Sequence, residues 1–389
     1  MFYSFTYSIP YIIFTFILII LYNREICAIN IGDKKKYTRI RYVTFLLLLL
    51  FFGLRGYLLT DWYSYKPEFD SLSLNLTYDN IFKNSWWDPG FIIYSIIIKF
   101  IYPDFHFWLF INTLTDLICL SIVFKRYNKS YVFSWIIFIG FYGLTSEINL
   151  FRNIKAIEIF LLALPYLEKR KFCKYTLMII LASLFHSSAV IYLFVYFFIE
   201  KKYNAKALIF IIFVSFIIPI LKIDISKIIF DRFDSLSWTG MRVYDKIAEY
   251  YNNANTNPIS LGMLERIFSC ACVIKFYNSI TKPIARISMN SLLLFVFFYN
   301  IFWNFHVLSD RISILFEFSY WIFFPYLIFN YMRNKRGKKI MFYIILSLTL
   351  IKVSSTTDYI LAKYDNLLWG IESYNKRSIV FERDYLYNQ

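Results

Sequence analysis

Residues 9–21 read Ile-Pro-Tyr-Ile-Ile-Phe-Thr-Phe-Ile-Leu-Ile-Ile-Leu, a stretch without a single charged side chain. Similar apolar runs recur at Phe45–Leu54, Ala207–Leu221 and Ser291–Trp303. With their flanks, several approach the roughly 20 residues that a helix needs to cross about 30 Å of hydrocarbon. Tyrosine and tryptophan crowd the ends of these runs, as an interfacial aromatic belt would. The pattern predicts an all-α, polytopic integral membrane protein.

Composition and charge agree with this class. The 389 residues are 59% hydrophobic and only 17% charged, whereas soluble domains carry about 25% charged residues. The net charge of +16 comes from clusters between the apolar runs, at Lys34–Lys36, Lys125–Lys129, Lys169–Lys174, Lys201–Lys206 and Arg333–Lys339. Such clusters mark the cytoplasmic ends of membrane helices and set their orientation. We therefore expect the lipid bilayer, and no nucleic acid, as a partner.

Charged breaks divide the chain into about 10 to 12 transmembrane or re-entrant helices in one domain, residues 1–353. They are expected near 3–22, 42–59, 89–102, 106–124, 131–145, 149–167, 174–199, 205–221, 262–278, 287–304, 312–330 and 340–353. Two long breaks, 60–88 and 222–261, are not dominated by cations, which places them on the outer, periplasmic face. A polar C-terminal tail, 354–389, is expected on the same side.

Two segments break the regular alternation of crossings. Charge placement leaves Asp88–Tyr102 as a re-entrant or interfacial segment. Cations at both Lys174 and Lys201 place both ends of the next anomalous segment inside. Between them, Ser183, His186, Ser187 and Ser188 interrupt the apolar run at its centre, which favours a hairpin of two half-helices over one overlong helix. Broken helices at membrane depth are tolerated where they line a cavity, so His186 is predicted to mark a site.

Ionisable side chains inside membrane segments are functional candidates by default. The candidates are Arg55, Arg152, His186, and the adjacent Asp310 and Arg311. A guanidinium pairs bidentately with phosphate, and a histidine beside it can hold or deprotonate a sugar hydroxyl. The three arginines are expected near the same outer face, as an anion site.

Each candidate also has a simpler explanation. Arg55 can snorkel to the membrane interface, Arg311 can pair with Asp310, and His186 can be a satisfied polar residue between packed helices. The five cysteines have no metal-ligand spacing, and no dinucleotide or phosphate-loop motif occurs. We expect no metal and no cofactor.

Five short motifs occur in a set order along the chain. They are Arg55-Gly56-Tyr57-Leu58-Leu59-Thr60-Asp61-Trp62-Tyr63-Ser64-Tyr65, Asp88-Pro89-Gly90-Phe91, Arg152-Asn153-Ile154-Lys155-Ala156, Leu181-Ala182-Ser183-Leu184-Phe185-His186-Ser187-Ser188-Ala189 and Arg311-Ile312-Ser313. Together they resemble motifs of the EpsG/Wzy-like family of bacterial polysaccharide polymerases. The first resembles the family's Arg…Gly-Thr-Asp-Tyr-x-x-Tyr, with Leu59 where the family usually has Gly. The fourth resembles Ala-x-x-Phe-His-x-Ser-Ala.

The resemblance implies an O-antigen or capsule polymerase of the bacterial inner membrane, with its active site facing the periplasm. Its substrate would be a polyprenyl-diphosphate-linked oligosaccharide, used without a nucleotide sugar or a metal. A chain-length regulator protein is an implied partner. On this hypothesis Arg152 and Arg311 hold the diphosphate and His186 orients or deprotonates the acceptor hydroxyl. The remaining candidates, Arg55, Asp61, Tyr65 and Asp310, would contact the substrate.

Other functions compete with this hypothesis. An O-antigen ligase has similar chemistry but concentrates histidine in a large outer loop, and 222–261 contains none. A flippase or transporter of lipid-linked oligosaccharide would show an internal repeat of paired broken helices, and none is evident. A membrane acyltransferase would carry a His-x-x-x-x-Asp signature, which is missing.

Overall fold

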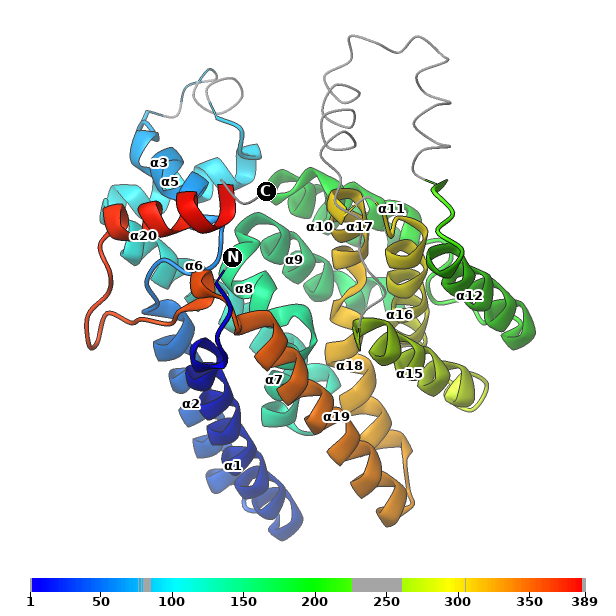
Figure 1. Ribbon diagram of the computed structural model, residues 1–389. Coiled ribbons are helices and arrows are strands. Elements are labelled where there is room, and N and C mark those ends of the chain that lie inside the picture. The colour runs from blue at the N-terminus through cyan, green and yellow to red at the C-terminus, as the bar shows by residue number, and fades with distance from the viewer. Residues whose placement is uncertain are drawn as a thin grey trace, which may run out of the picture. The chain divides into compact units, whose positions relative to one another are not determined.

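The computed structural model describes residues 2–75, 77, 79, 85–225, 261–304 and 306–386, and within these ranges it contains helices and no β-strand. Figure 1 shows the arrangement. The helices are α1 (Ile9–Ile31), α2 (Lys34–Leu48), α3 (Trp62–Ser71), α5 (Pro89–Ile101), α6 (Phe105–Tyr127), α7 (Tyr131–Phe138), α8 (Leu144–Asn149), α9 (Phe151–Glu168), α10 (Phe172–Phe185), α11 (Ile191–Val195), α12 (Ala205–Ile220), α15 (Leu261–Phe276), α16 (Pro283–Ile301), α17 (His306–Ser313), α18 (Phe318–Tyr326), α19 (Lys335–Thr357) and α20 (Tyr374–Phe381).

Six helical stretches among the described residues are long and apolar enough to cross a membrane. They are Phe5–Ile31, Phe105–Tyr127, Tyr131–Asn149, Pro283–Ile301, Arg311–Tyr331 and Lys335–Thr357. Every predicted membrane segment overlaps at least one helix. The prediction of an all-α, multi-pass membrane protein is therefore confirmed.

Two predicted boundaries need correction. The cationic cluster Lys34–Lys36 is the first turn of α2 rather than a loop, because Gly32 ends α1 at φ 76° and Asp33 caps the next helix. The Asp33 side chain accepts a hydrogen bond from the backbone N–H of Lys36 at 2.9 Å, as an N-cap residue does. The last predicted segment, 340–353, is also too short, since α19 begins at Lys335 behind an Asn334 cap.

The two predicted irregular segments are irregular in the structure. Helix α5 has 13 residues and therefore spans about 20 Å, less than the hydrocarbon thickness. Helix α10 ends at Phe185, and His186 takes up extended backbone, φ −153° and ψ 121°. The chain then reverses, because the Tyr175 hydroxyl near the start of α10 donates to the Tyr192 carbonyl of α11 at 2.6 Å. The break at His186 is confirmed.

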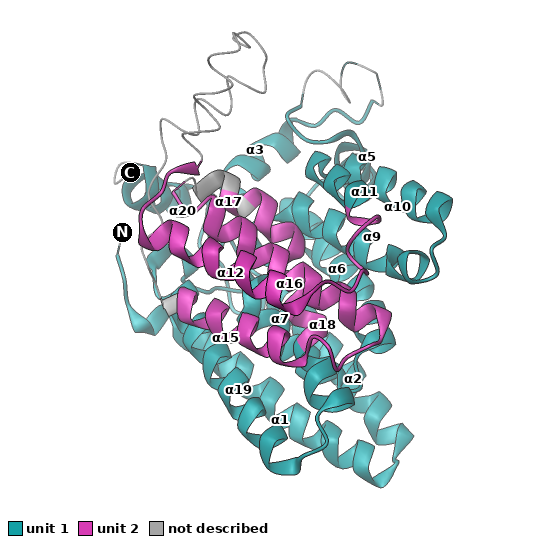
Figure 2. Ribbon diagram, turned by 90° about the vertical axis from the view of Figure 1, so that its right-hand side faces the viewer, with its two compact units in different colours: residues 1–194, 324–389 teal, residues 195–323 magenta. Residues whose placement is uncertain are grey.

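The chain forms two compact units, residues 1–194 with 324–389, and residues 195–323 (Figure 2). The C-terminal residues 324–389 belong to the first unit, and the predicted single domain of residues 1–353 with a tail of 354–389 stays a prediction. In the second unit, Asn290 of α16 ties the chain before α12, with Nδ2 donating to Ile199 O at 2.6 Å and Lys201 O at 2.9 Å. Most of the predicted outer loop 222–261 lies outside the described residues.

The C-terminal segment is packed onto the chain that follows α2. Backbone N–H groups of Gly56 and Leu59 donate to Asp365 O at 3.2 Å and Leu361 O at 3.0 Å. Gly56 is required here, because a Cβ at this position would run into the Asp365 carboxylate. On α20, the ring of Phe381 stacks on Tyr63 with centroids 4.3 Å apart. Residues 358–386 thus hold the loop 54–63, from which several predicted site residues come.

Arg55 lies in the interior of the first unit, with 2% of its side chain exposed. Its Nη1 donates to Phe52 O at 2.5 Å and Thr113 Oγ1 at 2.8 Å, and its Nη2 donates to Glu147 O at 3.0 Å. The Glu147 carboxylate lies 3.9 Å from Nη1 and accepts from Thr113 Oγ1 at 2.7 Å. Buried ions must be paired and hydrogen-bonded, and this pair joins three segments, after α2, in α6 and in α8.

We predict that Arg55→Met destabilises the protein by about 3–5 kcal/mol, because it leaves the Glu147 carboxylate buried and unpaired. Glu147→Gln alone should likewise leave the Arg55 guanidinium buried without a counter-ion. The double variant, Arg55→Met with Glu147→Gln, should be more stable than either single variant. Unfolding of the purified proteins in lipid nanodiscs measures this cycle. Additive losses would show that the pair does not stabilise the fold.

Candidate functional site

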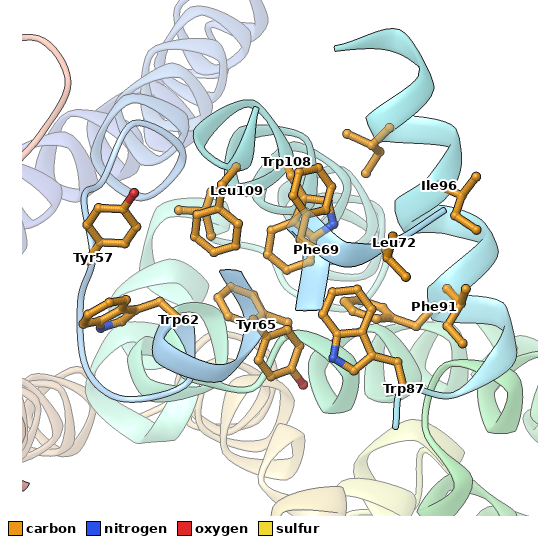
Figure 3. Close-up of a cluster of buried hydrophobic side chains, with 14 of the residues drawn as sticks. Tyr57, Trp62, Tyr65, Phe69, Leu72, Trp87, Phe91, Ile96, Trp108 and Leu109 are labelled. Carbon is orange, nitrogen blue, oxygen red and sulfur yellow. The ribbon is translucent and has the colours of Figure 1, made fainter. Parts of the chain in front are cut away.

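An aromatic cluster builds the platform on which the site residues stand. It is formed by side chains from the loop after α2, from α3 and α5, and from the starts of α6 and α9 (Figure 3). Trp108 is fully buried at its centre, with ring centroids 5.1 Å from Phe151 and 6.0 Å from Trp87. Aromatic side chains have few rotatable bonds, so such a cluster fixes the residues at its edge. Tyr65 is one of these edge residues, 4% exposed and 4.9 Å from Phe151.

Arg152, in the first turn of α9, is held from two sides. Its Nε donates to the Tyr65 hydroxyl at 2.9 Å, and its Nη1 donates to Asp88 Oδ2 at 2.8 Å. Burial raises the pKa of Tyr65, so the phenol stays neutral and accepts this bond. The guanidinium carbon lies 4.6 Å from the ring centroid of Trp86, which is half exposed. Within the described chain, Nη2 of Arg152 makes no hydrogen bond, so two N–H donors remain for a ligand.

Asp88 joins this arginine to the hairpin tip. It precedes Pro89, which starts α5. Its Oδ2 accepts from Arg152, and its Oδ1 accepts from the backbone N–H of Ser187 at 3.2 Å. Burial raises the pKa of Asp88, and the guanidinium of Arg152 opposes that rise. One carboxylate therefore positions both the arginine and the residue next to His186.

Close contact between α5 and α10 depends on Gly90. A Cβ on Gly90 would lie 2.8 Å from the Cβ of Leu184 and 2.9 Å from its carbonyl oxygen. Real Cβ atoms do not approach backbone this closely, so only glycine fits. The glycine lies two residues after Asp88, and Leu184 lies two residues before His186. The close approach at Gly90 thus brings the Asp88 carboxylate within hydrogen-bond distance of Ser187, next to His186.

His186 is buried, with 7% of its surface exposed. Its Nδ1 lies 3.4 Å from the backbone N–H of Ser188 and accepts from it, which caps the short helical turn Ser187–Val190. A neutral imidazole that accepts at Nδ1 carries its proton at Nε2, and we infer this tautomer from the bond. Its second nitrogen is then a hydrogen-bond donor.

The loop before α3 is anchored by Asn149 at the end of α8. Its Oδ1 accepts from the backbone N–H groups of Thr60 at 2.9 Å and Asp61 at 2.8 Å. Just before these residues, Leu59 has a left-handed backbone, φ 61°. A non-glycine residue in this region costs about 1–3 kcal/mol, and the packed surroundings must hold it there. Asp61 is thereby placed at the start of α3, one turn before Tyr65.

The predicted site residues divide into three groups. Tyr65 and Arg152 are in contact, and Asp88 links them to the neighbour of His186. Arg55 is in the same unit, but protein acceptors occupy its guanidinium in the interior. The last two, Asp310 and Arg311, belong to the second unit, on α17, and their joining the site stays a prediction.

Sequence reasoning missed two features. Trp86 stacks on Arg152, but a tryptophan in a loop gives no signal without the fold. The second is Asp116 of α6, which forms a buried ion pair with Lys155 of α9. Lys155 also donates to Asn112 O at 2.8 Å. The signal for Asp116 was available, since it is the only acidic residue in the predicted segment 106–124. No group of His, Cys, Asp and Glu in the described ranges could hold a metal ion.

The fold defines a class, a multi-pass all-α membrane protein, and within it a partly exposed arginine lies beside a broken helix. A family model described as the EpsG family matches residues 38–366, and the chain belongs to this family. At the level of the family it is a polysaccharide-polymerase-like membrane protein. The match covers all five motifs. No curated protein and no solved structure matches the chain.

We predict that Gly90→Ala pushes α5 away from α10 and separates Asp88 from Ser187. Overpacking of this kind typically costs about 1–3 kcal/mol, and here the clash is with backbone. Thermal unfolding of the purified protein should show the loss. Gly337→Ala is the matched control, because its Cβ would come no nearer than 3.3 Å, to the flexible end of Met332. If both variants are as stable as the unmodified protein, α5 and α10 do not approach each other closely at Gly90.

Proposed function

We propose that this chain is a membrane glycosyltransferase that joins polyprenyl-diphosphate-linked oligosaccharide repeat units. It would act at the outer face of the bacterial inner membrane, in synthesis of O-antigen, capsule or exopolysaccharide. Family membership supports the class of reaction. The observation that carries the proposal is the environment of Arg152. The Tyr65 hydroxyl, the Asp88 carboxylate and the Trp86 carbonyl hold its Nε and Nη1, while the two N–H donors of Nη2 remain unused within the described chain.

The donor diphosphate would bind at Arg152. A guanidinium whose Nε and Nη1 are fixed presents Nη2 in a defined direction, so little side-chain entropy is lost on binding. Asp88 keeps the guanidinium in place, and the two side chains are still 14% and 15% exposed, so the ion pair is not closed off from a ligand. Arg311 would supply a second contact to the diphosphate, and the adjacent Asp310 would contact the substrate.

The sugar next to the diphosphate would stack on Trp86. Half of this side chain is exposed, and it lies directly beside the guanidinium. Aromatic faces suit the apolar C–H surfaces of sugar rings, and the exposed half of Trp86 offers such a face beside the guanidinium. Asp61, at the start of α3, would accept hydrogen bonds from sugar hydroxyls.

In the reaction the bond between the anomeric carbon and the diphosphate oxygen breaks. A hydroxyl oxygen of the next lipid-linked repeat unit bonds to that carbon, and its proton passes to the departing diphosphate or to water. The negative charge grows on the leaving diphosphate, and Arg152 would stabilise it there. Because Nδ1 of His186 accepts from Ser188, we favour a role in which Nε2–H holds the hydroxyl or a phosphate oxygen over one as proton acceptor.

The function is tested by deleting the gene and resolving surface polysaccharide by length. A polymerase deletion should leave single repeat units at the surface and remove the ladder of longer chains. Loss of all surface polysaccharide would instead support a flippase or a ligase. Complementation with variants then assigns residues.

Arg152→Ala should abolish the ladder while the amount of protein in the membrane stays normal. Arg152→Lys should restore it only in part, because an ammonium is a point charge and cannot replace the guanidinium fork. Arg311→Ala is expected to behave as Arg152→Ala does. The control is Arg170→Ala, which removes an arginine from the predicted cytoplasmic loop after α9. Full activity of Arg152→Ala at normal expression would remove this residue from the site.

Two substitutions at His186 distinguish a hydrogen bond to the substrate from removal of the acceptor hydroxyl proton. His186→Ala should lower the polymerisation rate by about 10–100-fold if it removes one hydrogen bond worth about 1.5–3 kcal/mol. His186→Gln keeps a donor near Nε2 and should recover most of that rate. A general base contributes about 10²–10⁴-fold, and glutamine cannot replace it. The polymerisation rate of the purified protein with lipid-linked repeat units distinguishes the two roles. Alanine and glutamine variants that are equally inactive would identify His186 as the base.

A further inference from the structure

A cavity of about 630 Å³ lies in the first unit, between the last turns of α1 and the first turns of α19. Four lysines line it: Lys129, Lys335, Lys338 and Lys339. It is at the end of the helices where the cationic clusters lie, the predicted cytoplasmic side, and shares no residue with the site around Arg152. The proposed polymerisation gives this cavity no role.

The four lysines have no acidic partner. Within the described part of the chain, none of them forms an ion pair with a carboxylate. The nearest acidic candidate on α1, Glu25, is fully buried and accepts hydrogen bonds from Ser130 Oγ at 2.5 Å and Tyr131 N at 2.9 Å. Four cations that line one cavity without a carboxylate partner repel one another, and a bound anion would relieve this.

The position of the lysines increases that repulsion. Lys335, Lys338 and Lys339 occupy the first turns of α19, where the helix dipole already places partial positive charge. Acidic residues are favoured in this position, yet the first turn of α19 has none. The arrangement is unfavourable for the protein alone and favourable for a bound anion.

The walls of the cavity are apolar and open toward lipid. Aromatic rings form its floor, with Tyr22 and Phe342 stacked at 4.9 Å between centroids. At its edge, Ile29 is 40% exposed and Tyr343 is 53% exposed. The spans of α1 and α19 are only 33% and 22% buried, so these helices face the bilayer. An occupant must therefore combine an anionic head with hydrocarbon chains.

We propose that this cavity binds the headgroup of an anionic phospholipid from the cytoplasmic leaflet. The lysine ammonium groups would contact the phosphate oxygens, and the acyl chains would lie along the exposed apolar faces of α1 and α19. Basic pockets between transmembrane helices on this side of a membrane suit such headgroups. The partner is defined by the net negative charge of its headgroup together with its acyl chains, a combination that neither a zwitterionic lipid nor a soluble phosphate offers.

Cys27 provides a direct test, because it lines the cavity and its thiol is exposed. A variant that keeps Cys27 alone is reconstituted in bilayers of phosphatidylcholine, with or without phosphatidylglycerol, and labelled with an uncharged maleimide. If the anionic lipid is present at about ten times its dissociation constant, occupancy should slow labelling about tenfold. Phosphatidylcholine alone should give no protection.

A matched variant that keeps Cys173 alone controls for surface charge. Cys173 is also exposed and lies between Lys171 and Lys174 on the same predicted face, but outside the cavity. Anionic lipid lowers the local thiolate concentration at both positions, so only the extra slowing at Cys27 reports occupancy. Equal slowing at Cys27 and Cys173 would overturn the proposal.

Charge removal completes the test. In the Cys27 variant, Lys335→Gln, Lys338→Gln and Lys339→Gln together should abolish the protection. The control set, Lys169→Gln, Lys171→Gln and Lys174→Gln, removes the same charge from another loop and should preserve it. Inorganic phosphate added to phosphatidylcholine bilayers should not protect Cys27; protection there as strong as by phosphatidylglycerol would overturn the lipid as occupant.

Discussion

The carboxylate of Asp88 is the contact on which the site geometry depends. Three pieces of chain meet at its two oxygens: the start of α5, the guanidinium of α9 and the backbone after His186. Each oxygen serves a different partner, so neither partner can move without leaving an unsatisfied group. Buried polar groups in low dielectric are held this strictly because an unmade hydrogen bond there is costly. The aromatic cluster around Trp108 then holds Tyr65 and the start of α9 in place beside this carboxylate.

The two arginines of the first unit show how the same side chain takes different roles. Arg55 donates to Phe52, Thr113 and Glu147 in the buried interior, and it joins helices. Arg152 has partners on Nε and Nη1 and faces a half-exposed ring. In the sequence, Arg55 and Arg152 look alike, because each is a charged residue near the end of an apolar segment. The difference is in the number of acceptors that the fold brings to each guanidinium.

Helices were predictable from sequence because hydrocarbon thickness and charge placement act on every segment locally. The break at His186 was predictable for the same reason, since polar residues interrupt an apolar run in the chain itself. Long-range contacts were not predictable. Residues 354–386 are polar in composition, yet they pack on the loop after Gly56. Leu59, which departs from the expected glycine, still adopts the left-handed backbone that a glycine would suit, because neighbouring contacts impose it.

The hold of residues 358–386 on the loop after α2 has a consequence for how the protein is made. Leu367 N donates to Leu54 O at 2.8 Å, and the Tyr11 hydroxyl of α1 donates to Ala362 O at 2.8 Å. The first helices therefore enter the membrane long before their partners exist. At about 5–20 residues per second, the roughly 300 intervening residues take on the order of 15–60 s to synthesise. Throughout that time Asp61, in the loop, and Tyr65, in the first turn of α3, lie beside a segment that lacks its C-terminal contacts. A ribosome that stalls before residue 358 therefore leaves inserted helices whose connecting loop has no packing partner.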